Sequence, residues 1–190
     1  MNQIHMSRSG EISPEIRRVA QTEGLPPEEV ADKVSRGSIV VLKNRSRANV
    51  IPIGIGQGLR TKINANIGTS RDHLKIDEEM EKARVAVGVG ADTLMDLSTG
   101  GNLRKIRKRI LSETRIPLGT VPIYETALYA AEHKEGIVHM DKEDLFSVIE
   151  QQAGEGIDFM TVHCGVTLSA IEQLRQQGRL LNVVSRGGAF

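Results

Sequence analysis

Polar and glycine-rich segments follow five apolar stretches of this 190-residue sequence, where a binding or catalytic site would form. The last of these segments contains Ser185, Arg186 and Gly187. Arginine offers a planar charged fork, serine a hydroxyl group and glycine an exposed backbone amide, and together these suit phosphate or carboxylate. A plain turn with an exposed arginine is the simpler alternative, because glycine pairs are common turn formers. We predict an anion site at this segment.

The other polar segments each allow a functional and a structural interpretation. Asn64 and Asn66 alternate along a predicted strand, so their amides face one side, where they bind a ligand or satisfy loop backbone groups. Residues 98–101, before a predicted helix, form an anion site or only a helix cap. Tyr124 and His163 contact a ligand or belong to the core. Because five predicted strands in succession end in polar residues, a ligand-binding site is favoured over five separate structural explanations.

The elements that must position these residues alternate between β-branched runs and amphipathic helical patterns. We predict strands over residues 61–67, 93–97, 118–123, 159–162 and 181–184. Between them, helices begin at Asp77, near Asn102 and at Asp141, the first with Met80, Ala83 and Val87 facing inward. This order predicts an α/β fold, a (β/α) TIM-type barrel that binds its ligand at the carboxyl ends of the strands.

Two regions are expected along the chain. Residues 1–60 form an N-terminal region with helices from Ser13 and Pro26, a strand over 38–42 and a flexible glycine-rich approach at residues 54–58. Residues 61–190 form a partial barrel. Gly-x-Asp recurs at 90–92 and 156–158, which supports a repeated turn into a buried strand. A closed barrel needs about 250 residues, so we expect truncation after about five βα units.

The composition favours a cytoplasmic, soluble protein. With 25 basic and 24 acidic residues, nothing indicates a nucleic acid or an anionic membrane as partner. No apolar run approaches the roughly 18 residues of a membrane span. The single cysteine, Cys164, excludes an internal disulfide, and we interpret it as a small buried residue behind the barrel wall. The basic run at 104–109 is interpreted as the solvated face of a helix.

Five ordered motifs, with a sixth near the N-terminus, resemble the phosphomethylpyrimidine synthase family, ThiC, of thiamine biosynthesis. They read KINANIG at 62–68, GADTLMDLSTG at 90–100, GTVPIY at 119–124, TVHCGV at 161–166, VVSRGG at 183–188 and GEISPE at 10–15. The resemblance implies a radical S-adenosylmethionine lyase that rearranges aminoimidazole ribonucleotide into hydroxymethylpyrimidine phosphate. It also implies substrate-binding roles for Asn66, Met95, Tyr124, His163, Ser185, Arg186 and Gly187.

The same resemblance implies cofactors that this sequence does not hold by itself. The full-length family uses a [4Fe–4S] cluster, S-adenosylmethionine and zinc, and forms homodimers. Its cluster is held by a C-terminal cysteine-rich motif, whereas Cys164 is the one cysteine here. We therefore expect a fragment or a truncated relative that binds no metal through its own residues and is inactive alone.

Three alternatives stay open. The first is 5-hydroxybenzimidazole synthase of anaerobic cobamide biosynthesis, which shares these motifs, the substrate and the cofactors. The second is an inactive truncated barrel that binds a phosphorylated ligand or a partner chain. The third, a phosphate-binding aldolase or decarboxylase, ranks last because Lys62 lies near the wrong end of its strand.

Overall fold

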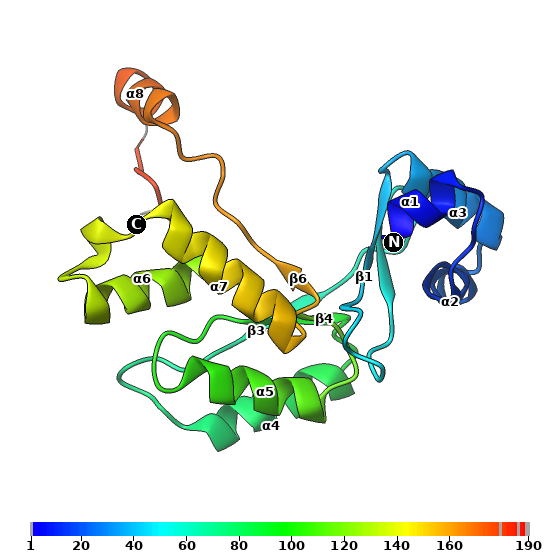
Figure 1. Ribbon diagram of the computed structural model, residues 1–190, viewed down its shortest axis with the longest axis horizontal. Helices are drawn as coiled ribbons and strands as arrows, with labels where there is room; N and C mark the ends of the chain where they lie inside the picture. Colours follow the sequence, from blue (N-terminus) through cyan, green and yellow to red (C-terminus); the bar gives the residue numbers. More distant parts are fainter. Residues whose placement is uncertain (1, 179, 186, 189–190) are drawn as a thin grey trace.

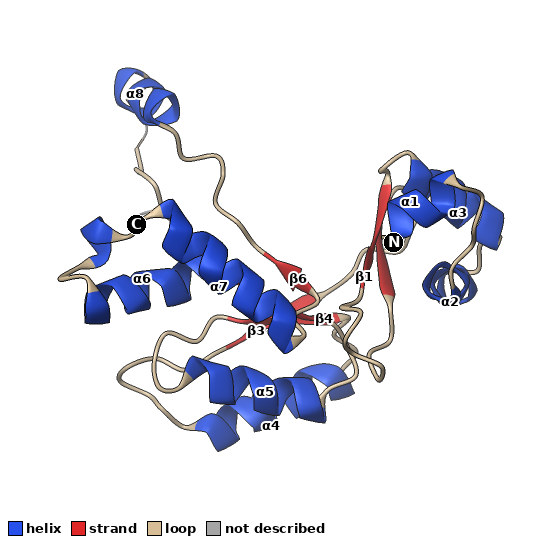
Figure 2. Ribbon diagram, viewed as in Figure 1, coloured by secondary structure: helices blue, strands red, loops and turns tan. Residues whose placement is uncertain are grey.

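Two separately packed groups of elements make up the structure, one on a two-stranded sheet and one on a four-stranded sheet (Figures 1 and 2). The computed structural model describes residues 2–178, 180–185 and 187–188. Among these residues, no helix is long and apolar enough to cross a lipid bilayer.

Three helices pack on a β-hairpin in the N-terminal group. The elements are α1 (Gln3–Arg8), α2 (Pro14–Glu23), α3 (Pro27–Ser35), β1 (Ile39–Leu42) and β2 (Ile53–Gly56). Helix α2 begins as the sequence predicts, because the Ser13 hydroxyl accepts a hydrogen bond from the Ile16 amide at 3.1 Å. Gly24 ends it in the left-handed conformation, with φ of 68°. Ile16, Val30 and Ile39 lie in the core that these elements enclose.

Part of the glycine-rich approach is a strand and the rest a turn, which corrects the expectation of a flexible segment at residues 54–58. Gly54 and Gly56 belong to β2, which pairs antiparallel with β1. A Cβ atom at Gly56 would lie 2.1 Å from the carbonyl oxygen of Ser38. The hairpin therefore closes only because this position has no side chain.

The four-stranded sheet is parallel, with its strands in the order of the sequence, as predicted. Its strands are β3 (Asn64–Ile67), β4 (Thr93–Asp96), β5 (Leu118–Thr120) and β6 (Phe159–Met160). The elements between and after them are α4 (Ile76–Gly88), α5 (Leu103–Glu113), α6 (Pro122–His133), the 3₁₀ helix η1 (Ile137–His139), α7 (Lys142–Glu155) and α8 (Leu168–Gln176). This part of the chain is an α/β sheet that does not close on itself.

Helices α4 and α5 lie side by side against one face of this sheet (Figure 1). Met80 of α4 and Ile106 of α5 pack on Leu94 and Leu118 of the strands, and all four are buried. The expected inward position of Val87 is wrong, since this side chain is 39% exposed. Glu79, one position before Met80, is buried instead.

Four predicted strands differ from the structure. The first begins at Asn64 instead of residue 61. The third ends at Thr120, and Pro122 begins α6, because proline lacks an amide hydrogen and its fixed φ suits the first turn of a helix. The fourth is only Phe159–Met160, and its contact with β5 ends where the Thr161 amide donates to the Thr120 carbonyl at 2.8 Å. Residues 181–184 form no strand, because they run beside α8 and pair with no strand of the described sheet. Helices α1, α6 and α8 were not predicted.

The repeated Gly-x-Asp turns carry the same hydrogen bonds in both places. The Asp92 amide donates to the Ile63 carbonyl, and its carboxylate accepts from the Ile63 amide, both at 2.8 Å. Asp158 makes the same two bonds with Leu118, both at 2.9 Å. Each aspartate therefore joins the start of its own strand to the start of the preceding one.

Arginines from the N-terminal region hold both aspartates. Arg60 pairs with Asp92, and the buried Arg47 pairs with Asp158, whose side chain is fully buried. The Arg47 guanidinium also donates to the carbonyls of Leu111 at 3.2 Å and Thr114 at 2.8 Å. The N-terminal region is thus attached at the amino ends of the parallel strands, away from the edge where ligands bind in such sheets.

The basic run at 104–109 is not wholly solvated, because Arg107 is 2% exposed. Its guanidinium pairs with Glu125 of α6 and Glu155 of α7, each at 2.8 Å. Burial opposes its charge, but the hydrogen bonds to Glu155 and Glu125 outweigh this and raise the pKa of Arg107. One arginine of α5 therefore ties three helices together.

Candidate functional site

One row of residues crosses all four parallel strands on the face turned away from α4 and α5. In the strand register, Asn66 pairs with Met95, Met95 with Gly119, and Gly119 with Phe159. Leu94 and Leu118, each next to a member of this row in its strand, pack in the core under α4 and α5. Because successive residues of a strand point to opposite faces, the row itself points away from these helices. A Cβ atom at Gly119 would lie 2.4 Å from the Phe159 ring, which therefore covers that position.

Asn66 and Tyr124 line one pocket of about 440 Å³ at the carboxyl edge of the sheet. Tyr124 reaches it from the first turn of α6 rather than from a strand end. The rest of the lining comes from the loops after β3 and β4, through residues 67–70, Leu97 and Thr99, and from Lys82 of α4. The strand register and this pocket bring together Asn66, Met95 and Tyr124, three of the residues proposed from the sequence.

Hydrogen bonds join the two loops that form this pocket. The Thr69 amide donates to the Ser98 hydroxyl at 3.1 Å, and the Thr69 hydroxyl donates to the Gly100 carbonyl at 2.7 Å. Ser98 in turn donates to Asp96 through its amide at 3.0 Å and its hydroxyl at 2.5 Å. Ser98 therefore joins the two loops. It does not cap α5, because the side chain that caps this helix is Asn102.

Two glycines permit the close approach of these loops. A Cβ atom at Gly68 would lie 2.6 Å from the Ser98 amide nitrogen, and φ of 150° is rare for other residues. A Cβ atom at Gly100 would lie 2.5 Å from the carbonyl carbon of Ser70. The amides of these loops donate within the protein, Gly68 to Glu79 at 2.7 Å, Thr69 to Ser98 and Thr99 to Thr69, and so fix the shape of the pocket wall.

Asp96 lies directly behind this pocket with only 6% of its surface exposed. Burial raises the pKa of Asp96, while the hydroxyl and amide of Ser98 and the charge of Arg107 act against this rise. Because folding raises the pKa, protonation of Asp96 favours the folded state. Its contribution is complete below about pH 4 and is lost as the pH rises through the folded-state pKa.

Replacing Asp96 with asparagine should remove this pH dependence. Asparagine keeps an oxygen that accepts from Ser98 and carries no charge, so the variant should gain stability relative to wild type as the pH rises from about 4 to 8. Urea unfolding at several pH values measures this, with the exposed Asp72→Asn as control. If the free energy of unfolding of the variant differed from that of wild type by the same amount at every pH, the explanation from a buried charge would be contradicted.

His163 and Gly187 lie together in a second location, on the segments that follow β6 and α8. A Cβ atom at Gly187 would lie 2.2 Å from the Cε1 atom of the His163 ring. The His163 Nδ1 atom is buried and has no hydrogen-bond partner among the described residues. The Ser185 hydroxyl accepts from the Gly188 amide at 2.9 Å. Arg186 lies outside the described residues.

The described residues do not suit an iron–sulfur cluster. A [4Fe–4S] cluster is held by cysteine thiolates, and Cys164 is the one cysteine of the sequence. It is exposed, which corrects its interpretation as a buried residue of the barrel wall. Within the described ranges, no three His, Cys, Asp or Glu side chains lie together as metal ligands.

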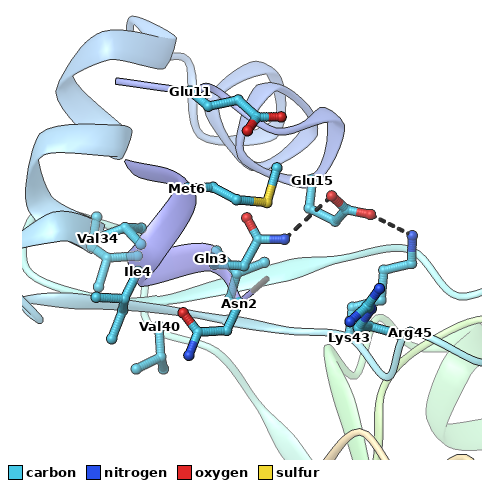
Figure 3. A pocket seen from close by; sticks show the side chains of 12 residues that line it. Asn2, Gln3, Ile4, Met6, Glu11, Glu15, Val34, Val40, Lys43 and Arg45 are labelled. Carbon is cyan, nitrogen blue, oxygen red and sulfur yellow. Dashed lines mark hydrogen bonds and ion pairs between the residues drawn. The ribbon is translucent and has the colours of Figure 1, made fainter. Parts of the chain in front are cut away.

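A larger hollow of about 620 Å³ lies between α1 and β1, away from the parallel sheet (Figure 3). At its polar end, Lys43 donates to Glu15 at 2.7 Å, and the Gln3 amide donates to the same carboxylate at 3.3 Å. The bond from Lys43 holds the pKa of Glu15 below its usual value. These groups satisfy one another, and the predicted site residues lie elsewhere.

The carboxyl-edge pocket thus combines an asparagine amide, hydroxyl-bearing loops, an ammonium group and an apolar row beside it. Such a surface can orient a small polar ligand by hydrogen bonds and hold an anionic group. Sequence reasoning did not find Lys82, Thr69 or Phe159. A lysine at a helical position gives no signal of where its amine ends, and only the strand register reveals the place of Phe159.

Comparison of the sequence with known proteins finds a matching family. A model of the radical SAM ThiC family matches residues 2–190. The chain is similar to proteins named phosphomethylpyrimidine synthase, at 52% identity in Thermodesulfovibrio yellowstonii, 51% in Dehalococcoides mccartyi and 49% in Methanocaldococcus jannaschii. Each match covers 100% of this chain and 44% of the relative, so the chain spans less than half of their length.

Proposed function

Because this chain belongs to the radical SAM ThiC family, we propose that it provides the first part of the substrate site of a phosphomethylpyrimidine synthase. The reaction is the conversion of aminoimidazole ribonucleotide to hydroxymethylpyrimidine phosphate in thiamine biosynthesis. The observation that carries this proposal is the pocket shared by Asn66 and Tyr124 at the carboxyl edge of a parallel sheet. The names of the relatives favour this product over 5-hydroxybenzimidazole.

In this proposal each side chain has a role that fits its chemistry. Asn66 and Tyr124 donate and accept hydrogen bonds that orient the ribose or imidazole groups. Met95, next to Asn66 in the sheet, forms an apolar wall. His163, Ser185 and Gly187 contribute from the segments after β6, and Arg186 binds phosphate with its guanidinium fork.

We further propose that the parallel sheet is the first part of a (β/α) TIM-type barrel, with residues 1–60 as its N-terminal region and 61–190 as the partial barrel. Separate apolar cores around Ile16 and Leu94, and the in-order parallel strands, support this division. The open edge strands β3 and β6 are where further strands would pair.

The family uses S-adenosylmethionine and an iron–sulfur cluster. Together these would generate the radical that starts the rearrangement. The described residues bind and orient substrate in this proposal, and no step is assigned to them through the cluster. Zinc, a homodimer of the full-length protein and a cytoplasmic location are proposed from the family resemblance.

Calorimetric titration of the chain with aminoimidazole ribonucleotide tests the proposed site. Replacing Asn66 with alanine should weaken binding about tenfold, since a hydrogen-bonded polar contact is worth roughly 1.4 kcal/mol. Asn49→Ala, at an exposed asparagine of the N-terminal region, is the control. Equal affinity of the Asn66 variant and wild type would remove this residue from the site, and absence of wild-type binding would contradict the proposed role of the chain.

A further inference from the structure

A buried glutamine of α7 spans the corner where β5 passes into α6. The Gln152 side chain accepts a hydrogen bond from the Thr120 hydroxyl at 2.6 Å and donates one to the Glu125 carboxylate at 2.6 Å. Gln152 is 1% exposed. Because Thr120 ends β5 and Glu125 lies in the first turn of α6, the two bonds hold both sides of the segment that carries Tyr124.

The first turn of α6 is tied to its neighbours through Glu125. Val121, which precedes the helix, supplies no side-chain cap, and the bond from the Tyr124 amide to the Val121 carbonyl at 3.0 Å is local to the turn. Glu125 connects the turn to Arg107 of α5 at 2.8 Å on one side and to Gln152 on the other, where α6 and α7 lie side by side (Figure 1). The orientation of this turn therefore depends on the partners of Glu125.

The neighbouring glutamine of α7 provides an internal comparison. Gln151 is exposed, and its side chain donates to Glu155, one turn further along the same helix, at 2.9 Å. A glutamine that only stabilised the surface of α7 would need no more than such a local bond. Gln152 is buried instead, and its two bonds reach residues 27 and 32 positions away in the sequence. Its side chain thus serves the corner around Tyr124 rather than its own helix.

We propose that Gln152 is a positioning residue of the substrate site, which sets the place of Tyr124 in the carboxyl-edge pocket by holding Thr120 and Glu125. This inference rests on the proposed function for the identity of the ligand. Tyr124 lines the pocket, whereas Gln152 lies behind the corner and outside the lining. Gln152 therefore acts on ligand affinity through the first turn of α6, without contacting the ligand.

Titration of the full chain with aminoimidazole ribonucleotide, together with NMR of the ring of Tyr124, one of two tyrosines in the sequence, tests the inference. Gln152→Met keeps a side chain of similar length but loses both bonds, so affinity should fall about three- to tenfold. The Tyr124 ring signals, assigned with Tyr124→Phe, should shift in this variant in the absence of ligand. Gln151→Met is the matched control and should equal wild type in both measurements.

Gln152→Glu separates positioning from a general loss of stability. While the new carboxyl group is protonated, it accepts from Thr120 and donates to Glu125 as the carboxamide does. Once ionised it repels Glu125, because Arg107 already pairs with both Glu125 and Glu155. Compared with wild type at the same pH, affinity should be nearly unchanged at about pH 5.5 and about three- to tenfold lower at about pH 9. A ratio of affinities that does not change with pH overturns the inference.

The outcomes separate this inference from the proposed function. Ribonucleotide binding that Gln152→Met leaves unchanged overturns the inference alone. A wild-type chain that does not bind the ribonucleotide contradicts the proposed function, and the Tyr124 ring signals then decide the inference. A shift in Gln152→Met that is absent in Gln151→Met supports the positioning of Tyr124, and unchanged signals overturn it.

Discussion

Replacing Arg47 with methionine is expected to destabilise the chain by about 3–5 kcal/mol, the cost of breaking a buried ion pair by removing one partner. Methionine keeps much of the apolar volume, but Asp158 is left fully buried without its charge partner. The carbonyls of Leu111 and Thr114 also lose their donor. Urea unfolding followed by circular dichroism measures the loss.

The exposed Arg45, two positions earlier, is the control and should change stability by less than about 0.5 kcal/mol when replaced by methionine. In the double variant Arg47→Met, Asp158→Asn, the loss should be smaller than the sum of the single losses, because the uncompensated charge is gone. Additive losses would show that the two residues act separately and would contradict the clamp at the amino ends of the strands.

Replacing Arg107 with methionine is expected to cost about 2–4 kcal/mol, somewhat less than for a fully buried pair because Glu125 is partly exposed. The variant leaves two carboxylates, Glu125 and Glu155, facing each other without a cation between α6 and α7. Thermal unfolding gives the loss, and hydrogen exchange should show it most clearly in α6 and α7.

Arg104 offers a matched comparison on the same helix. It pairs with the same Glu155, at 3.1 Å, but is itself 71% exposed. Arg104→Met should therefore cost less than about 1 kcal/mol. Similar losses for the two variants would mean that burial of Arg107 does not determine its contribution.

Local signals predicted much of the fold. Ser13 and Asp141 cap their helices as expected, because capping depends on residues only three positions apart. The Gly-x-Asp repeat correctly marked two turns into neighbouring parallel strands. Asn64 and Asn66 face the same side, and their amides are hydrogen-bonded at 3.1 Å.

Features that depend on distant residues were not predictable in the same way. The burial of Arg107 depends on glutamates 18 and 48 positions away, and that of Arg47 on an aspartate 111 positions away. The length of a strand depends on its neighbours, so the pattern at residues 181–184 did not produce one. Lys82 was missed because its role depends on where the β3 loop passes over α4.

The central claim is that residues from the β3 loop, α6 and the segments after β6 bind one phosphorylated ligand. Amide chemical shifts of the chain, recorded by NMR with and without aminoimidazole ribonucleotide, test it most directly. We predict concerted changes at Asn66–Ser70, Thr99 and Tyr124 together with His163, Ser185 and Gly187. Saturable binding that shifts only one of these two groups, or only the hollow beside Lys43, would contradict the claim.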